Sequence, residues 1–212
     1  MSYGKVFVPE CKITTKIMKL ISTVLKILFP ITILLACVVA IFLSRSLRLQ
    51  NTDQIKFISQ SEKLSSIKEI VNLPPFKNKV IVVDIWSVTC SPCLQQLKTA
   101  TSFKKRLSTN DVVFLYISYN NKFRVDRQLK WKETIENNKL TGYHLEADAD
   151  LYTNIWSEIN KEKDAGQGIP RYLIVDKNGT IINFNASGLS KPDDFYQEIL
   201  QVLNNTGSLS MK

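Results

Sequence analysis

The stretch "VVDIWSVTCSPCLQQL", residues 82–97, holds two cysteines, Cys90 and Cys93, with two residues between them. Residues 80–85, which overlap its start, are rich in β-branched side chains and alternate too little in polarity for a half-exposed strand. They predict a fully buried central strand. From Cys93 onward, apolar side chains recur every three or four residues, which predicts an amphipathic helix. The cysteine pair therefore lies where a buried strand gives way to a helix.

Further strands and helices are predicted on both sides of this stretch. Residues 57–71 have apolar side chains at near-helical spacing and predict a helix, while residues 112–118, "VVFLYIS", predict a second buried strand. A polar helix is expected around residues 131–136, an apolar patch lies at 143–145, and another helix is expected over 150–159. Alternating strands and helices are typical of a parallel sheet with crossover connections.

The C-terminal part has a different pattern. Residues 172–184, "YLIVDKNGTIINF", are two apolar runs joined by a turn that contains Asn178 and Gly179. An Asn-Gly pair between apolar runs is a strong signal for a β-hairpin, so the last two strands should be antiparallel. A final helix is expected over residues 191–203. We therefore predict an α/β fold with a mixed sheet.

Near the N-terminus, residues 27–43, "ILFPITILLACVVAIFL", contain no charged side chain. A run of this length and polarity predicts a transmembrane helix. Five lysines precede it and two arginines closely follow it, so the positive-inside rule predicts a cytoplasmic N-terminus and an exported C-terminal domain. A buried core helix, a cleaved signal peptide and a lipoprotein signal ending at Cys37 are the alternatives.

These patterns divide the chain into five parts. We expect a basic cytoplasmic segment (residues 1–26), a transmembrane helix (27–43), a linker (44–54), a globular domain (55–204) and a flexible tail (205–212). The formal net charge is +9, but residues 1–50 hold seven of the 28 basic residues and only one of the 19 acidic ones. Because much of the excess flanks the apolar run, the charge does not predict nucleic-acid binding.

Four cysteines are present, of which Cys11 is expected in the cytoplasm and Cys37 in the membrane. The exported domain retains Cys90, Cys93 and one histidine, His144, which is too few ligands for a structural zinc site. Covalent haem attachment needs a histidine directly after the second cysteine, where this chain has a leucine. A purely structural disulfide would close a loop of only four residues and would constrain the unfolded chain little.

Reversible thiol chemistry is the remaining interpretation of the pair. A thiol at a helix N-terminus faces unpaired amides and the positive end of the helix dipole, which favour its thiolate. We expect Cys90, just before the helix, to be the attacking thiolate. Cys93, one turn inside the helix, would then resolve the mixed disulfide.

The motif resembles that of the thioredoxin superfamily, in particular its membrane-tethered bacterial thiol:disulfide oxidoreductases. The shared pattern is a buried strand with an acidic residue and a tryptophan, followed by Cys-x-Pro-Cys; here these are Asp84, Trp86 and residues 90–93. The resemblance implies a thioredoxin-like fold, a central mixed sheet flanked by helices with a C-terminal antiparallel hairpin. It also implies a reversible Cys90–Cys93 disulfide, and neither a metal nor another cofactor.

The resemblance also assigns roles to individual residues. Asp84 would be buried and would relay a proton to the resolving thiol, with a pKa raised by desolvation; a solvated carboxylate at the strand end is the alternative. Pro170, in "GQGIPRYLIV", would be a cis-proline beside the disulfide, or otherwise an ordinary trans turn proline. Ile169 before it would offer backbone hydrogen bonds to a substrate, and Trp86 and Thr89 would also contact it. Thr89 departs from the family, where a bulky residue is common.

Together these features predict a membrane-tethered, extracytoplasmic thiol:disulfide oxidoreductase, acting as a reductase rather than an oxidase or isomerase. Its expected partners are thiols or disulfides of exported proteins, an electron donor in or outside the membrane, and the lipid bilayer. We expect it in the cell membrane with the domain on the periplasmic or extracellular face. A redox-inert scaffold and a copper chaperone are the alternatives, and His144 is expected to be a surface or packing residue.

Overall fold

The computed structural model describes residues 12–47, 51–58, 64–107, 111–120, 125–162 and 166–207. The chain divides into two compact units, Met1–Leu49 and Gln50–Lys212, which are described separately. Residues 1–11 of the predicted cytoplasmic segment, which include Cys11, residues 48–50 of the predicted linker and residues 208–212 of the predicted tail lie outside the described residues.

The first unit contains one helix, α1 (Lys12–Leu47). Within it, Lys16–Ser44 is long and apolar enough to cross a membrane, with a mean hydropathy of 2.8 over its most apolar window. The uncharged run at residues 27–43 lies inside this segment, and Pro30 is accommodated within the helix. A signal sequence near an N-terminus has the same properties. Cys37 is a free, exposed cysteine on α1.

The second unit is built on a six-stranded mixed sheet with the order β1-β4-β3-β2-β5-β6. The first four strands in this order are parallel to one another, and β5 is antiparallel to both β2 and β6. The antiparallel hairpin predicted around Asn178 and Gly179 is confirmed. The strands are β1 (Ile55–Phe57), β2 (Val80–Trp86), β3 (Val112–Ser118), β4 (Gly142–Glu146), β5 (Arg171–Val175) and β6 (Ile181–Asn183).

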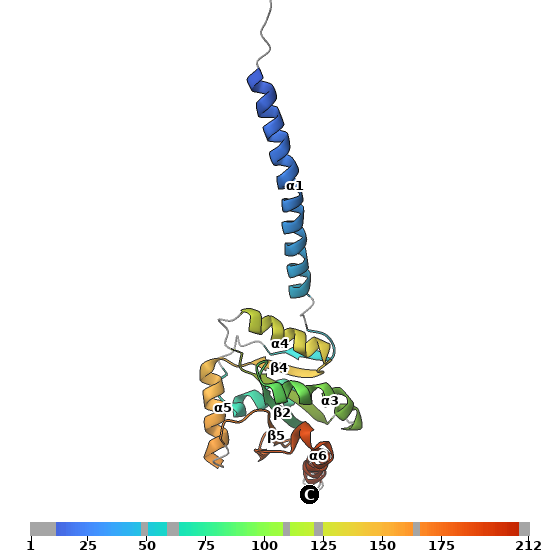
Figure 1. The fold of residues 1–212 in the computed structure, drawn as a ribbon. Helices are drawn as coiled ribbons and strands as arrows, with labels where there is room; N and C mark the ends of the chain where they lie inside the picture. The colour runs from blue at the N-terminus through green and yellow to red at the C-terminus, as the bar shows by residue number, and fades with distance from the viewer. Residues whose placement is uncertain are drawn as a thin grey trace, which may run out of the picture. The chain divides into compact units, whose positions relative to one another are not determined.

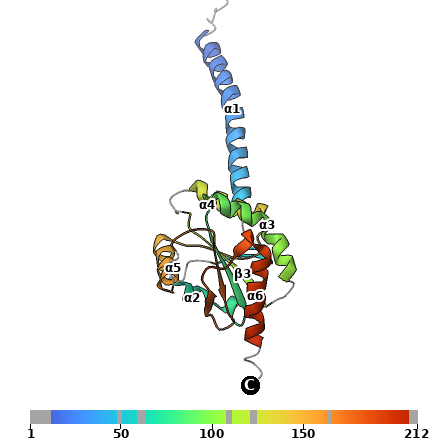
Figure 2. The same ribbon diagram turned by 60° about the horizontal axis from the view of Figure 1, so that its bottom comes forward.

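Helices cover both faces of this sheet (Figure 1). Figure 2 shows α3 and α6 on one side of the sheet and α2 and α5 on the other. Because side chains alternate along a strand, Val82 of β2 packs towards α6, whereas Ile81 and Val83 pack towards α2 and α5. The helices are α2 (Ile67–Val71), α3 (Ser91–Leu107), α4 (Val125–Asn137), α5 (Ala149–Glu162) and α6 (Pro192–Gly207), with short 3₁₀ turns at Pro74–Phe76 and Gly188–Ser190.

The prediction of a helix over residues 57–71 is wrong for the first part of this range. Ile55–Phe57 forms the edge strand β1, whose backbone pairs with β4, and the Phe57 ring packs on Trp131 at a centroid distance of 5.5 Å. Of the described residues in that range, only α2 is helical, beginning after Ser66, whose side chain accepts a hydrogen bond from the Glu69 amide. Pairing with the sheet edge, a long-range interaction, outweighs the local spacing of apolar residues.

The C-terminal helix is longer than predicted. It was expected to end near residue 203, with a flexible tail from residue 205, but α6 continues to Gly207. Its apolar stripe, which includes Phe195 and Ile199, packs against β2 and β5 in one core cluster. This packing stabilises the helix along most of its length.

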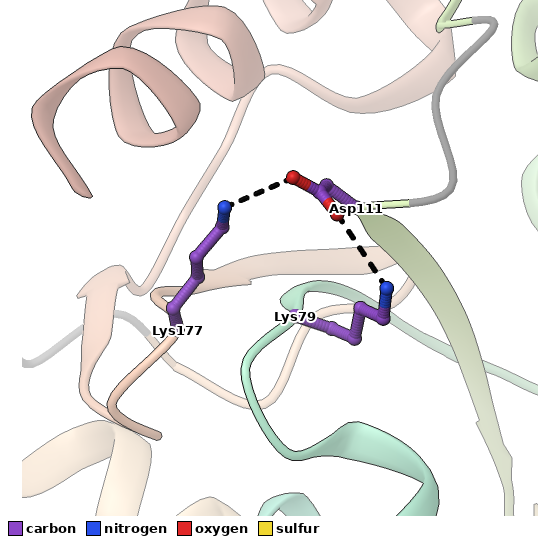
Figure 3. Close-up of polar contacts among 3 residues, drawn as sticks. All are labelled: Lys79, Asp111 and Lys177. Atoms are coloured by element: carbon purple, nitrogen blue, oxygen red, sulfur yellow. Dashed lines mark hydrogen bonds and ion pairs between the residues drawn. The ribbon is translucent and has the colours of Figure 1, made fainter. Parts of the chain in front are cut away.

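A cluster of ion pairs connects the ends of β2, β3 and β5 at the end of the sheet opposite the cysteines. Asp111, just before β3, forms ion pairs with Lys79, just before β2, at 3.5 Å and with Lys177, just after β5, at 3.0 Å (Figure 3). The hydrogen bond and charge of Lys177, followed by those of Lys79, lower the pKa of Asp111. A lowered carboxyl pKa stabilises the fold above the ordinary pKa and ceases to do so as the pH falls through the lowered value.

Candidate active site

The two cysteines lie at the end of β2, where the chain turns through residues 87–89 into α3. Cys90 and Cys93 form a disulfide with a Cα–Cα distance of 5.3 Å. Cys93 is only 1 % exposed, whereas Cys90 is partly exposed. The Cys93 amide nitrogen also lies 3.2 Å from the Cys90 sulfur. Cys90 is therefore the more accessible of the two cysteines, and its position at the N-terminal end of α3 would favour its thiolate.

The segment before β5 lies against the sulfur of Cys90. The carbonyl oxygen of Ile169 is 3.6 Å from the Cys90 sulfur, although the two residues are 79 positions apart. The Ile169–Pro170 peptide bond is cis, as expected from the sequence. Both residues are partly buried, so they border the sulfur while part of their surface stays accessible. Their contact with a substrate stays a prediction.

Asp84 lies on β2 and is 2 % exposed. Its neighbours in register are Tyr116 on β3 and Tyr172 on β5. Burial raises the pKa of Asp84 to about 7, against smaller opposing effects of the Tyr172 hydroxyl and the Lys104 ammonium group. The alternative of a solvated carboxylate at the strand end is therefore wrong, and a carboxyl group that titrates near neutral pH is suited to proton transfer.

Comparison with known proteins agrees with this geometry. Residues 78–181 match a family model described as thioredoxin-like. These residues form a thioredoxin-like domain. Taken with the fold, the close Cys90–Cys93 pair makes this domain a thiol:disulfide oxidoreductase.

Several solved structures are similar to the thioredoxin-like domain. One is the thioredoxin domain of a thiol-disulfide oxidoreductase from Bacteroides vulgatus, with 23% identity, a TM-score of 0.45, and coverage of 61% of this chain and 82% of that one. Another is a thiol:disulfide interchange protein from a Bacteroides species (26%, TM-score 0.44, coverage 62% and 78%). A third is a thioredoxin family protein from Chlorobium tepidum (18%, TM-score 0.46, coverage 60% and 81%). No curated protein matches the sequence significantly.

Thr89 and Trp86, both predicted to contact substrate, differ in their placement in the thioredoxin-like domain. Thr89 is exposed beside Cys90, and its hydroxyl lies 3.1 Å from that of Ser87. Trp86 is completely buried in a core cluster with Cys93. This corrects the expectation for Trp86, whose ring supports the site from within the core rather than facing a substrate.

His144 is a packing residue of the domain, which agrees with the sequence-based expectation. It is fully buried on β4, its Nε2 lies 2.8 Å from the Leu140 carbonyl oxygen, and its ring stacks on Tyr116 at 4.8 Å. Burial lowers the pKa of His144 to about 4, so the ring is neutral at physiological pH. Among the residues that the structure describes, no group of three or more His, Cys, Asp or Glu side chains could hold a metal ion.

Sequence reasoning missed two polar residues near the site. The Asn120 side-chain oxygen accepts a hydrogen bond from the Ser118 hydroxyl at 3.0 Å and lies 3.5 Å from the Val88 amide, which links the turn before Cys90 to β3. Lys104 lies on α3, and the positive charge of its ammonium group lowers the pKa of Asp84. Its position seven residues after Leu97 places it on the buried stripe of α3, and this spacing is the signal that could have identified it.

We predict that Asp84→Asn stabilises the protein at pH 8. The folded protein favours the protonated form of Asp84, because its pKa is raised. The contribution of this carboxyl group to stability is fully present below its pKa in the unfolded chain, near 4, and is lost as the pH rises through its folded-state pKa of about 7. An asparagine does not ionise, so the free energy of unfolding should exceed that of the wild type by roughly 2–4 kcal/mol at pH 8 and should approach it at pH 4. Urea unfolding of the oxidised full chain in detergent micelles, followed by tryptophan fluorescence, measures this difference.

Asp111→Asn is the matched control, because the pKa of Asp111 is lowered instead of raised. That variant should be less stable than the wild type at pH 8. An Asp84→Asn protein that is no more stable than the wild type at pH 8 would contradict the assignment of a costly buried carboxylate.

Proposed function

We propose that this chain is a membrane-anchored thiol:disulfide oxidoreductase that exchanges disulfides with exported proteins outside the cytoplasm, in the reducing direction. The observation that carries the proposal is the unequal exposure of the pair, with Cys90 accessible at the start of α3 and Cys93 buried. Cys93 also shares a core cluster with Tyr116, the register partner of Asp84. An accessible nucleophile, a shielded resolving thiol and a buried acid–base group are what sequential exchange requires.

The reaction proceeds in two steps. The Cys90 thiolate attacks one sulfur of a substrate disulfide, a mixed disulfide forms, and the other substrate sulfur leaves as a thiolate that takes a proton from water. The Cys93 thiol then gives its proton to the Asp84 carboxylate and attacks the Cys90 sulfur. The Cys90–Cys93 disulfide forms, and the second substrate sulfur leaves as a thiolate that takes a proton from water. Two electrons pass to the substrate, and a dithiol donor in or outside the membrane restores the reduced pair.

The surface around Cys90 supports a protein substrate. The Ile169 carbonyl next to the Cys90 sulfur offers a backbone acceptor for an extended segment. Pro170 follows Ile169 in the chain, and the exposed Thr89 precedes Cys90. We propose that these three residues form the docking surface. A threonine before the first cysteine leaves more room there than a bulky side chain, which would admit larger groups on the substrate.

The N-terminal helix supports the proposed location. Lys16–Ser44 is long and apolar enough to span a bilayer, and the lysines before its uncharged run favour a cytoplasmic N-terminus. The domain after it would then work on the oxidising side of the membrane, where disulfides form and persist. The reducing direction follows the resemblance to membrane-tethered relatives that keep exported thiols reduced.

The first test is replacement of the nucleophile. Cys90→Ser should lower the rate of insulin reduction with dithiothreitol to that without enzyme, because the serine hydroxyl cannot form the mixed disulfide. The assay uses the full chain in detergent micelles. Cys37→Ser, which removes the free cysteine of α1, is the control and should retain full activity. Wild-type activity in Cys90→Ser would exclude the mechanism.

The reducing direction predicts the reduction potential of the Cys90–Cys93 pair. A reductase should have a value close to that of thioredoxin, about −270 mV. Equilibration of the full chain with glutathione or dithiothreitol buffers, followed by thiol alkylation and mass measurement, gives this value. A potential above about −180 mV would instead assign the protein to the oxidases or isomerases.

The proposed orientation can be measured in cells of a Gram-negative host. Alkaline phosphatase fused after the last residue should be active, since it folds only after export, and β-galactosidase fused at the same position should be inactive. The fusion should stay in the membrane fraction at its uncleaved mass, as expected for a retained anchor. The reverse pattern of enzyme activities would place the domain in the cytoplasm.

A further inference from the structure

Two tyrosines, Tyr119 and Tyr152, stack on each other in the thioredoxin-like domain, and we call them the tyrosine pair. Their ring centroids lie 4.8 Å apart at an interplanar angle of 18°, and Trp156 contacts Tyr152 edge-on at 6.1 Å. Trp156 is fully buried, whereas both tyrosines are only partly buried. Part of the tyrosine pair therefore stays at the surface, supported from within by the indole ring.

The strand directions place the tyrosine pair at the same end of the sheet as the cysteines. Tyr119 directly follows β3, and Tyr152 lies in the first turn of α5, which comes shortly after β4. Strands β2, β3 and β4 are parallel, so their C-terminal ends lie at one edge of the sheet. Cys90 follows the C-terminal end of β2 at that edge. This edge is where proteins with parallel strands most often bind their ligands.

Ile169 connects the surroundings of Cys90 with those of the tyrosine pair. Its carbonyl oxygen lies 3.6 Å from the Cys90 sulfur. The residue packs against the core cluster that contains Cys93 and also against the cluster that contains Trp156. Tyr152 packs against the second of these clusters as well. An apolar layer therefore extends from the sulfur towards the tyrosine pair.

The chain around Tyr152 is acidic, although the protein as a whole is basic. Residues 145–160 contain four acidic residues and neither lysine nor arginine, whereas the formal net charge of the chain is +9. Asp148 and Asp150 are exposed just before Tyr152, and Asp148 also accepts a hydrogen bond from the Leu151 amide at 2.9 Å. Carboxylates beside a binding surface attract basic partners and repel acidic ones. They therefore disfavour an anionic lipid surface or a nucleic acid as the occupant.

We propose that Tyr119, Tyr152 and Asp150 recognise protein substrates that carry an aromatic side chain near the reacting cysteine, with a basic residue beside it. This inference rests on the proposed exchange function and names its class of substrate. An extended segment advances about 3.3 Å per residue, so a side chain a few positions from a cysteine bonded to Cys90 reaches the tyrosine pair. An aromatic ring packs favourably there, and the Asp150 carboxylate attracts the neighbouring cation.

The experiment measures the reduction of three synthetic peptides, each joined to an identical copy through its single cysteine. Repeats of Phe-Lys, Ser-Lys or Phe-Glu flank that cysteine on both sides. The full chain in detergent micelles reduces them with dithiothreitol, and chromatography follows the products. Each rate is divided by the rate with dithiothreitol alone, which corrects for the reactivity of the peptide itself.

The wild type should favour the Phe-Lys peptide over both others. We expect kcat/KM to exceed that of the Ser-Lys peptide about fivefold, because aromatic pairs add to the burial of apolar surface. It should exceed that of the Phe-Glu peptide about threefold at low salt and less at high salt. A general attraction to the basic chain would have the opposite sign.

Substitutions assign the aromatic preference to the tyrosine pair. Tyr152→Ala should abolish the preference for phenylalanine over serine, whereas Tyr152→Phe, which keeps the ring, should retain it. Tyr196→Ala is the matched control, because it removes a partly buried tyrosine from α6 on the other side of the sheet (Figure 2). An unchanged preference in Tyr152→Ala would overturn the inference. If that variant does not fold, Tyr119→Ala serves in its place with the same expectation.

A second pair of substitutions tests the charge. Asp150→Asn should abolish the preference for lysine over glutamate. Asp194→Asn, which removes an exposed aspartate from the first turn of α6, should leave it unchanged. A preference that survives in Asp150→Asn would overturn the role of this carboxylate.

Reduction of hydroxyethyl disulfide, which is too small to span the surface from Cys90 to the tyrosine pair, separates this inference from the proposed function. A wild type that reduces hydroxyethyl disulfide but treats the three peptides alike would overturn the inference alone. A wild type that reduces neither hydroxyethyl disulfide nor the peptides would contradict the exchange function itself.

Discussion

Central strand β2 is paired on both edges, and the arrangement of the site depends on that pairing. Seven residues of β2 are buried, held in parallel register by β3 and in antiparallel register by β5. The first pairing sets Tyr116 beside Asp84. The second sets Tyr172 on its other side and brings the start of β5, with the cis Ile169–Pro170 bond, up to the end of β2. The cysteines follow directly, so both pairings determine what surrounds them.

The buried position of Asp84 lowers the stability of the fold when the carboxyl group is ionised, and it also raises the pKa of that group. A carboxyl group in the middle of a buried strand is costly when ionised, because no solvent compensates its charge. In return its pKa lies near neutrality, where a small change in electrostatic surroundings decides whether it carries a proton. The Lys104 ammonium group, also held away from water, partly offsets the cost of the Asp84 charge and is itself costly to bury. Asp84 and Lys104 therefore place two groups of opposite charge in the same buried region of the domain.

The structure also bears on the alternative functions. A copper chaperone would want a histidine that can reach the two sulfurs, but His144 is fully buried and bonded to the Leu140 carbonyl. A redox-inert scaffold needs neither a buried carboxyl group nor an accessible sulfur backed by a shielded one. Both features are present, at Asp84 and at Cys90 and Cys93. They favour exchange chemistry over either alternative.

The sequence by itself determined the features that depend on local pattern. These are the buried strand before the cysteines, the helix after them, the Asn-Gly hairpin, the uncharged N-terminal run and, through the family motif, Asp84 and Pro170. Only the tertiary structure decided which side chains meet across the sheet. It placed Trp86 inside the core, made Phe57 part of an edge strand, and directed Lys104 towards Thr141 and Tyr116. Strand pairing and the environment of a buried charge join residues far apart in the chain, and local spacing carries no information about those contacts.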